Sequence, residues 1–408
     1  MTQRWHIHLA GWLPIAWALD EDLRQTKMAL AGDADWCSFS SAKIIHAAWP
    51  AAISALPEAA LRGKIIICQA DNPPSFYLGT REFCVAAERT HHWVARSSEA
   101  RSQFELLGLP VIQAPYTVDR NIFRPLPERS GIRRSLGLSD NAFVIGNFHR
   151  DSEGEDLRKP KLQKGPDIFL QIARRVRAEV PNTTVLLAGP RRHWLLHALR
   201  AEGISVVFSG KEPDQIDDYG CNILPRERLN ELYQALDCCV ISSRWEGGPY
   251  AVLESLAAGR PVISTAVGTS RDVLGEACLF ASVEGAAEIL VSHALHGSLF
   301  SPCEEAATRA EISHSQEALR KSLLSLYSKL PRGSCGAGAR LISGLSLVAG
   351  KILPSQGRPH QRLDALRREI VSCAQTVSRP SEISALPENM SLEQLRERAV
   401  CIAADRQG

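Results

Sequence analysis

Residues 246–254 read Glu-Gly-Gly-Pro-Tyr-Ala-Val-Leu-Glu and follow an apolar run, 236–243, that is typical of a buried strand. The stretch opens a predicted helix that ends at Gly259, and the next strand is predicted to begin at Pro261. Pro249 suits the first helical position, because its missing N–H would have no partner inside the helix. Strand, helix and strand in this order indicate an α/β fold with a parallel sheet.

The same nine residues have the properties of an anion-binding site. Gly247 and Gly248 let the backbone approach a ligand, and the helix start offers N–H groups without intrahelical partners. Glu254 is a single carboxylate among apolar residues, so it needs a polar partner. It lies roughly 7–8 Å along the helix from its start, and its side chain tilts back toward that start. A nucleotide diphosphate, with a phosphate beside a hydroxyl-bearing group, would satisfy both features.

Residues 243–268 as a whole resemble the signature of the family 4 retaining glycosyltransferases of the GT-B fold. The resemblance rests on Glu246 and Glu254 with seven residues between them, on the small residues that end the helix, and on the Gly-x-Pro-Val strand that follows. It implies an α/β protein of two Rossmann-like, doubly wound domains facing a cleft, with extra C-terminal helices. It also implies that Glu246 faces the transferred sugar and that Glu254 accepts hydrogen bonds from the nucleotide ribose. The alternative is a buried structural glutamate and a surface glutamate.

Composition and charge place the chain among ordinary globular proteins. Of its 408 residues, 45% are hydrophobic and 23% are charged, and the formal charge of +2 is too small to predict a nucleic-acid partner. The eleven cysteines form no Cys-x-x-Cys pair, which favours reduced thiols over disulfides or a zinc site. No apolar run reaches the ~18–20 residues that a transmembrane helix needs. We therefore expect a cytoplasmic protein.

The alternation of apolar runs and helical stretches predicts three regions. Residues 1–125 are expected to form an N-terminal, acceptor-side Rossmann-like domain, and residues 140–330 a C-terminal domain that binds the nucleotide sugar. Residues 331–408 are expected to form a helical tail. The predicted strands are 43–49, 64–69, 92–95 and 111–115 in the first region, and 142–148, 184–188, 206–209, 238–242 and 261–265 in the second; helices are predicted to begin near Pro166, Arg191, Arg226 and Pro249.

Departure of a diphosphate requires stabilisation by a metal or by fixed cations, and this chain supplies cations. Arg150 follows a predicted strand, and Lys164 precedes the next helix. The resemblance implies phosphate-binding roles for an arginine and a lysine at these two points. An unusual insertion, 151–163, separates them and contains Arg158 as a rival to Arg150; Arg191 is a further candidate contact to the base or a phosphate. The closely spaced acidic pairs outside this loop do not end donor-side strands, so we expect no metal.

The acceptor side carries weaker signals. Relatives often carry a histidine after the strand that corresponds to 64–68, and here that place reads Gln69-Ala-Asp71. Gln69 could hydrogen-bond a sugar hydroxyl, and Asp71 could orient an acceptor. His46, at another strand end, could line the cleft, although an imidazole in such a position is as often a packing residue.

The resemblance implies transfer of a sugar from a nucleotide-diphosphate sugar to a saccharide or lipid-linked acceptor in polysaccharide biosynthesis. A glycosidase is disfavoured, because its two carboxylates flank one scissile bond. Two alternatives stay open: a non-catalytic scaffold that binds a nucleotide sugar, and a nucleotide-sugar epimerase on the same fold. The basic, partly apolar tail after Pro331 could make weak contact with the inner membrane surface or pack on the N-terminal domain.

Overall fold

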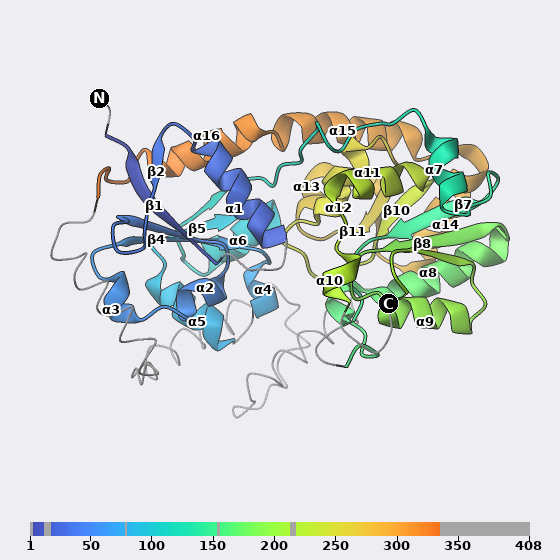
Figure 1. Cartoon of the computed structure of the whole chain (residues 1–408), viewed down its shortest axis with the longest axis horizontal. Coiled ribbons are helices and arrows are strands. Elements are labelled where there is room, and N and C mark those ends of the chain that lie inside the picture. The colour runs from blue at the N-terminus through green and yellow to red at the C-terminus, as the bar shows by residue number, and fades with distance from the viewer. Residues whose placement is uncertain (1–2, 12–17, 78–79, 153–155, 213–217, 335–408) are drawn as a thin grey trace. The chain divides into compact units, whose positions relative to one another are not determined.

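The computed structural model describes residues 3–11, 18–77, 80–152, 156–212 and 218–334, and its chain forms two compact units (Figure 1). Unit 1 contains the described residues up to Tyr116 together with those from Gln316 onward. Unit 2 runs from Thr117 to Ser315. Unit 2 begins at Thr117, before the predicted start of the donor-side domain at residue 140. It ends at Ser315, before the predicted end at residue 330, because the residues from Gln316 onward belong to unit 1.

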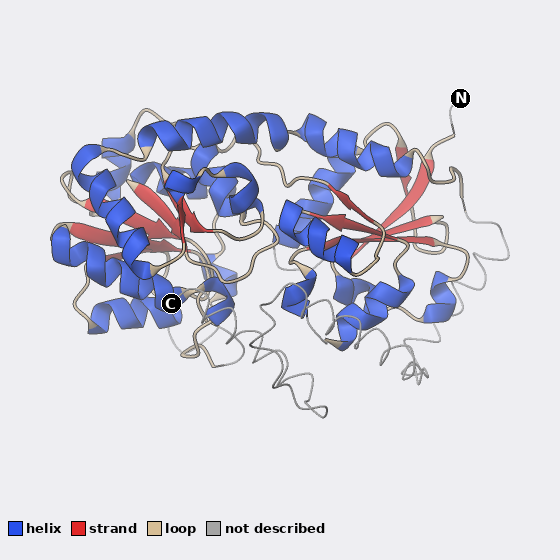
Figure 2. Ribbon diagram, turned by 180° about the vertical axis from the view of Figure 1, so that it is seen from behind, coloured by secondary structure: helices blue, strands red, loops and turns tan. Residues whose placement is uncertain are grey.

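Unit 1 is built on a six-stranded parallel sheet of order β2-β1-β3-β4-β5-β6. Helices cover both faces of this sheet (Figure 2), which explains why the inner strands β3 and β4 are buried at almost every residue rather than at alternate ones. The strands are β1 (Trp5–Ala10), β2 (Ala34–Trp36), β3 (Ile44–Ala47), β4 (Ile65–Ala70), β5 (His92–Ala95) and β6 (Val111–Gln113).

Two hydrophobic clusters fill unit 1, one on each face of the sheet. One contains Phe83, Trp93 and Phe104, which lie against one another. The other joins Trp5 of β1 to Tyr327 near the end of the described chain. The helices of this unit are α1 (Ala18–Ala29), α2 (Pro50–Ser54), α3 (Glu58–Leu61), α4 (Pro74–Tyr77), α5 (Arg81–Arg89), α6 (Ser98–Leu106) and α16 (Gln316–Tyr327).

Unit 2 has a second six-stranded parallel sheet, of order β12-β11-β10-β7-β8-β9. The chain starts in the middle with β7, builds outward to β9, and then returns to the other side of β7 with β10. The strand order therefore reverses between β7 and β10, and ligands bind at such reversals, outside the carboxyl ends of the strands. The strands are β7 (Phe143–Asn147), β8 (Thr183–Ala188), β9 (Val206–Ser209), β10 (Cys238–Ile241), β11 (Val262–Thr265) and β12 (Leu279–Phe280).

Helix α8 of unit 2 begins at the residue that the sequence predicts. Pro166 is the first residue of α8, and Ile168, Ile172 and Val176 of the same helix are buried at helical spacing. The elements are α7 (Arg129–Ser135), η1 (Leu162–Lys164), α8 (Pro166–Glu179), α9 (His193–Ala201), α10 (Tyr219–Asn222), α11 (Arg226–Ala235), α12 (Tyr250–Ala257), α13 (Thr269–Val273), η2 (Glu276–Cys278), α14 (Val283–His296) and α15 (Phe300–Ser313).

Each strand predicted from the sequence is present, within two residues at each end. Strands β1, β2 and β12 were not predicted, because β2 and β12 are only three and two residues long and β1 alternates buried with half-buried residues. Two helix starts differ: α9 begins at His193 rather than Arg191, and α12 at Tyr250 rather than Pro249. The predicted C-terminal tail lies almost wholly outside the described residues. Among those described, no helix has the length and apolarity required to cross a membrane.

Candidate active site in unit 2

The polar residues predicted for the donor side meet where the strand order of unit 2 reverses. Strands β7 and β10 are direct neighbours, with Ile145 paired with Cys238 and Gly146 with Cys239. His149 and Arg150 follow the carboxyl end of β7, and the loop from Ser242 to Pro249 follows that of β10. Neighbouring parallel strands end at the same edge of a sheet, so these two loops are brought together by topology.

Glu246 is the centre of a compact hydrogen-bonded cluster in this place. Its carboxylate Oε1 lies 2.6 Å from Lys164 Nζ and accepts a second hydrogen bond, of 2.8 Å, from Ser243 Oγ. The side chain of Glu246 is only 8% exposed, and that of Lys164 is 19% exposed. Burial acts to raise the pKa of Glu246, but the charge of Lys164 and the hydrogen bonds from Lys164 and Ser243 outweigh it and lower that pKa. Glu246 is therefore an ionised carboxylate held beside a lysine.

His149 completes the cluster as a neutral imidazole. Its Nδ1 lies 3.5 Å from Ser243 Oγ and 3.9 Å from Glu246 Oε1. Burial, reinforced by the charge of Lys164, lowers the pKa of His149 to about 4 although Glu246 acts in the opposite direction. At neutral pH the imidazole is thus uncharged, and Lys164 is the cation in contact with Glu246.

A tight backbone contact holds Lys164 in this position. Gly165 has φ +59°, in the left-handed region, and a Cβ at this residue would lie 1.8 Å from the carbonyl oxygen of Ser242. Ser242 Oγ donates to Gly165 O at 2.8 Å, and Arg244 N donates to Gln163 O at 2.8 Å. The Arg244 side chain reaches the same segment through Asp167 and Leu162 O. The short helix η1, which carries Lys164, is therefore fastened to the loop after β10.

We expect Gly165→Ala to destabilise the protein by about 2 kcal/mol or more and to lower turnover as well, because Lys164 would be displaced. Gly203→Ala is the matched control, since Gly203 has a similar φ of +63° but open space around its Cβ position. Urea unfolding of both variants measures the difference. Equal losses of stability in the two variants would show that the contact with Ser242 is unimportant.

The glycines after Glu246 lie in a closely packed turn before α12. A Cβ at Gly268 would meet Glu246 O at 2.5 Å and Gly247 O at 2.6 Å, so this side of the turn leaves no room for a side chain. Gly247 is buried and Gly248 is half-buried. Pro249 occupies the residue before α12 with extended ψ of 109°, rather than the first helical position. The helix start still lies next to Glu246, as the sequence predicts.

Glu254 lies in the second turn of α12 and is half-buried. Its Oε2 accepts a hydrogen bond of 2.9 Å from Tyr233 OH on α11. Burial, with Glu254 beside it, raises the pKa of the Tyr233 phenol well above its usual range, so the phenol remains a donor. The polar partner that the sequence requires for Glu254 is thus at least in part a tyrosine of this chain.

The predicted arginines occupy different environments. Arg150 is half-buried, and its Nη1 donates to Tyr219 OH on α10. Arg158 lies exposed in the 151–163 insertion. Arg191 is 8% exposed, and its backbone N donates to Asp218 Oδ1 at 2.7 Å. Of the two rivals for a phosphate-binding role, Arg150 is therefore the one fixed by packing next to the Glu246 cluster.

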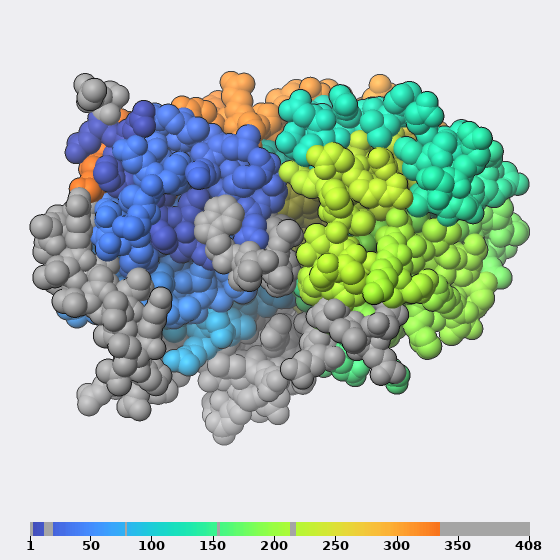
Figure 3. Space-filling view, in the orientation of Figure 1, coloured from blue at the N-terminus to red at the C-terminus, as the bar shows by residue number. Residues whose placement is uncertain are grey.

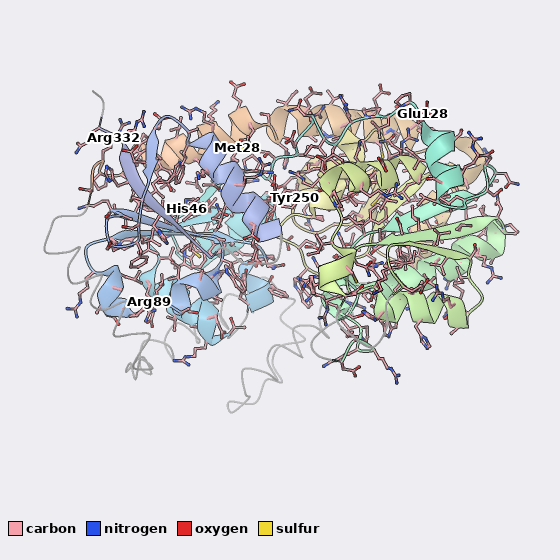
Figure 4. The ribbon with its side chains drawn as sticks, viewed as in Figure 1. Met28, His46, Arg89, Glu128, Tyr250 and Arg332 are labelled. Atoms are coloured by element: carbon pink, nitrogen blue, oxygen red, sulfur yellow. The ribbon has the colours of Figure 1, made fainter. Side chains whose placement is uncertain are left out.

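The acceptor-side candidates lie in unit 1, where two of them are internal. His46 and Gln69 are both 0% exposed, and His46 Nε2 lies 2.8 Å from Gln69 Nε2 (Figure 4 labels His46). His46 Nδ1 lies 2.6 Å from Tyr327 OH, and Gln69 Nε2 donates to Thr26 Oγ1 at 2.8 Å. Burial lowers the pKa of His46 to about 3. Contrary to the expectation that they face an acceptor, these two side chains join β3 and β4 to α1 and α16.

Asp71 is the third acceptor-side candidate and is half-buried. Its carboxylate accepts hydrogen bonds from Tyr77 OH and, at 3.1 Å, from Asn72 Nδ2. Asp71 therefore fastens the loop after β4 to α4, a role that an ordinary turn residue also has.

Sequence reasoning did not single out His149 or Ser243, both of which contact the Glu246 cluster. The sequence does contain a signal for both residues, because each is a polar residue directly after a predicted strand, where ligands bind in such sheets. Tyr219 was missed as well and had no such signal. No group of three or more His, Cys, Asp or Glu side chains suited to a metal ion occurs in the described ranges.

Known proteins are similar to this chain over part of its length. Residues 157–295 match the family model described as glycosyl transferases group 1. The chain is 26% identical over 174 residues to the lipopolysaccharide core biosynthesis mannosyltransferase LpsB of Rhizobium meliloti, covering 41% of this chain and 44% of that protein. It is 29% identical over 228 residues to a D-inositol 3-phosphate glycosyltransferase of Corynebacterium urealyticum, covering 51% and 49%. The chain thus spans about half the length of these curated relatives.

Among solved structures, the chain is similar to Anabaena Alr3699/HepE in complex with UDP and glucose. The TM-score is 0.62 at 14% identity, and the match covers 80% of this chain and all of that one. A likeness of this size establishes the two-sheet GT-B fold.

Proposed function

We propose that this chain, which is similar over residues 157–295 to the glycosyl transferases group 1, is a family 4 glycosyltransferase of the GT-B fold, and that it moves a sugar from a nucleotide-diphosphate sugar to a saccharide or lipid-linked acceptor with retention of the anomeric configuration. The reaction would belong to the biosynthesis of a polysaccharide or glycolipid. The Glu246–Lys164 contact of 2.6 Å at the strand-order reversal of unit 2 is the observation that carries this proposal.

The residues of this cluster have the chemistry that such a transfer needs. A sugar presents hydroxyl groups, for which an ionised, buried carboxylate such as Glu246 is a strong acceptor. A departing diphosphate gains negative charge, which a fixed ammonium such as Lys164 stabilises. Both groups lie beside the start of α12, where N–H groups add a partial positive charge. Gly247 and Gly248 let the donor approach the backbone.

We further propose that Arg150 and Arg191 assist at the phosphates and that Glu254 receives the ribose. Among the structurally similar proteins, Alr3699/HepE is described in complex with UDP and with UDP-glucose, which makes a uridine nucleotide the first donor to test. We expect no metal, because cations of the chain line the site. Transfer is tested by incubating the protein with nucleotide sugars and saccharide or lipid acceptors and detecting products by mass spectrometry. Absence of any donor-dependent product would favour the non-catalytic scaffold.

Glu254→Gln is expected to weaken nucleotide binding at least about tenfold, or about 1.4 kcal/mol, with little change in melting temperature. The amide would lose the charge-assisted acceptor for the ribose hydroxyls while keeping the bond from Tyr233. Calorimetric titration with a nucleoside diphosphate measures the loss, and Glu284→Gln, on the exposed side of α14, is the matched control. Unchanged affinity with a large loss of stability would make Glu254 a structural residue.

We propose a cytoplasmic location with weak contact at the inner membrane surface, based on the basic, partly apolar sequence after Pro331. Full-length protein is then expected to sediment with anionic vesicles at low salt and to be released at high salt. Protein that stays in the supernatant under both conditions would remove the membrane contact and leave the transferase proposal untouched.

A further inference from the structure

The imidazole ring of His149 turns one nitrogen toward the Glu246 cluster and leaves the other without a bond to it. Nδ1 lies 3.5 Å from Ser243 Oγ and 3.9 Å from Glu246 Oε1. Nε2 has no hydrogen-bond partner among the described residues, and it is not one of the described side-chain atoms that are closed off from solvent without a partner. The side chain as a whole is 12% exposed. Nε2 is therefore the polar atom through which this ring can meet a ligand.

The hydrogen bonds of Ser243 decide which nitrogen of His149 carries the proton. Ser243 Oγ donates its single hydrogen to Glu246 Oε1 at 2.8 Å, so toward His149 this oxygen can only accept. A proton on Nδ1 meets that oxygen favourably and also faces the negative charge of Glu246, whereas a lone pair on Nδ1 would face two oxygens. These contacts assign the proton to Nδ1. Because a neutral imidazole has only one N–H, Nε2 is a hydrogen-bond acceptor.

The surroundings keep the ring neutral. Burial lowers the pKa of His149 most, and the charge of Lys164 lowers it further, although Glu246 acts to raise it. The more remote charges of Arg192 and Arg150 also lower it, and the result is a pKa of about 4. A neutral acceptor does not attract a phosphate, whose oxygens are acceptors themselves. It suits a group that donates a hydrogen bond, such as a sugar hydroxyl.

His149 lies close to the carboxylate that faces the sugar in the proposed function. It follows the carboxyl end of β7, and Glu246 lies in the loop after the neighbouring strand β10. The next residue, Arg150, bonds to Tyr219 of helix α10, which lies on the face of unit 2 that Figure 3 turns to the viewer. A sugar in contact with Glu246 is therefore within reach of the His149 ring.

We propose that His149 is a specificity-determining residue for the donor sugar, and that its Nε2 accepts a hydrogen bond from one hydroxyl of that sugar. This inference rests on the proposed function and deepens it, because it names the sugar, rather than the diphosphate or the base, as the part of the donor that this side chain recognises. Ser243 and Glu246 hold Nδ1 and so fix the direction of Nε2. A donor without that hydroxyl would leave Nε2 unpaired and would bind less tightly.

Two substitutions separate the roles of the two nitrogens. The amide nitrogen of asparagine can take the place of Nδ1 and leaves nothing at Nε2, whereas the longer glutamine can bring its amide oxygen near the position of Nε2. His149→Asn is expected to weaken UDP-glucose binding about fivefold and to change UDP binding less than about twofold. His149→Gln is expected to keep the UDP-glucose affinity within about twofold of the wild type. Calorimetric titration measures these affinities, and His296→Asn, at the exposed end of α14, is the matched control.

Donor analogues identify the hydroxyl. A UDP-glucose in which fluorine replaces one hydroxyl cannot donate a hydrogen bond from that position. One such analogue is expected to bind the wild type about fivefold more weakly than UDP-glucose does. It should bind His149→Asn as tightly as UDP-glucose binds that variant, because the two changes remove the same hydrogen bond. If the asparagine variant does not fold, His149→Phe, which keeps a ring and removes both nitrogens, takes its place in this comparison.

Three results would each overturn the proposal: unchanged UDP-glucose affinity in His149→Asn, equal losses for UDP and UDP-glucose in that variant, or a His149→Gln variant that binds UDP-glucose as weakly as His149→Asn. Independent effects of the substitution and of every fluorinated analogue would also overturn it. If UDP-glucose binding depends on His149 as expected and no sugar is ever transferred, the contact stands and the proposed function falls. If sugar is transferred and His149→Asn binds UDP-glucose like the wild type, only this inference falls. Wild-type protein that binds neither UDP nor UDP-glucose contradicts both.

Discussion

Lys164→Ala is expected to lower the turnover of donor sugar about 100-fold or more, with a melting temperature close to that of the wild type. The ammonium of Lys164 is held 2.6 Å from Glu246 and, in our proposal, stabilises the charge that develops on the departing diphosphate. Since that charge is greatest in the transition state, the loss should fall mainly on kcat rather than on KM. Steady-state kinetics with a saturating acceptor measures it.

Lys159→Ala is the control, because Lys159 is an exposed cation in the neighbouring insertion and should be replaceable with less than a twofold effect. EDTA should leave the wild-type enzyme active if cations of the chain stabilise the diphosphate. If EDTA abolishes activity and magnesium or manganese restores it, a metal stabilises the departing diphosphate. That result would contradict the role given to Lys164.

Glu246→Gln is expected to lower the rate of sugar transfer about 100-fold or more, as Lys164→Ala does. The affinity for free nucleoside diphosphate is expected to stay unchanged or to rise a few-fold. The carboxylate, whose pKa is lowered by Lys164 and by its hydrogen bonds, is ionised at neutral pH and neutralises Lys164 before the donor arrives. A glutamine cannot do so, and the lysine would then be available to the phosphates. If Glu246 and Lys164 act as proposed, this variant loses sugar transfer but keeps or gains affinity for the nucleoside diphosphate.

The two effects are measured by donor turnover and by calorimetric titration with the nucleoside diphosphate. Glu202→Gln, which removes a half-buried carboxylate paired with Arg174, controls for the loss of one negative charge. A Glu246→Gln variant that loses transfer and nucleoside diphosphate affinity in equal measure would show that Glu246 supports the fold of the site rather than the sugar.

The donor side could be predicted from sequence because its parts are local. Glu246 is fixed by the strand that precedes it and the helix that follows, and Lys164 by the left-handed Gly165 and Pro166 at the start of α8. Parallel strands end at one edge, so knowing that Arg150 and Glu246 each follow a strand places both at the same edge of the sheet. Lys164, at the start of α8, is joined to that edge by the contacts of Gly165 and Gln163 with the loop after β10. Short-range sequence patterns and one topological rule were therefore enough to predict where the donor-side residues lie.

The rest depends on contacts between distant parts of the chain. His46 was a candidate for the acceptor because it ends a strand, yet it bonds to Tyr327, 281 positions away, and is closed inside unit 1. Gln69 is buried and donates a hydrogen bond to Thr26, 43 positions away. Tyr219 belongs to a four-residue helix with no periodic pattern, so its meeting with Arg150 and Arg191 became visible only in three dimensions.

A crystal structure of the wild-type protein with a bound nucleotide sugar or its nucleoside diphosphate tests the central claim most directly. Our account predicts a phosphate oxygen within hydrogen-bond distance of Lys164 Nζ, with the transferred sugar against the Glu246 carboxylate and the phosphates beside the start of α12. A nucleotide bound elsewhere in the chain, or one bound here while Lys164 and Glu246 contact only each other, would contradict it.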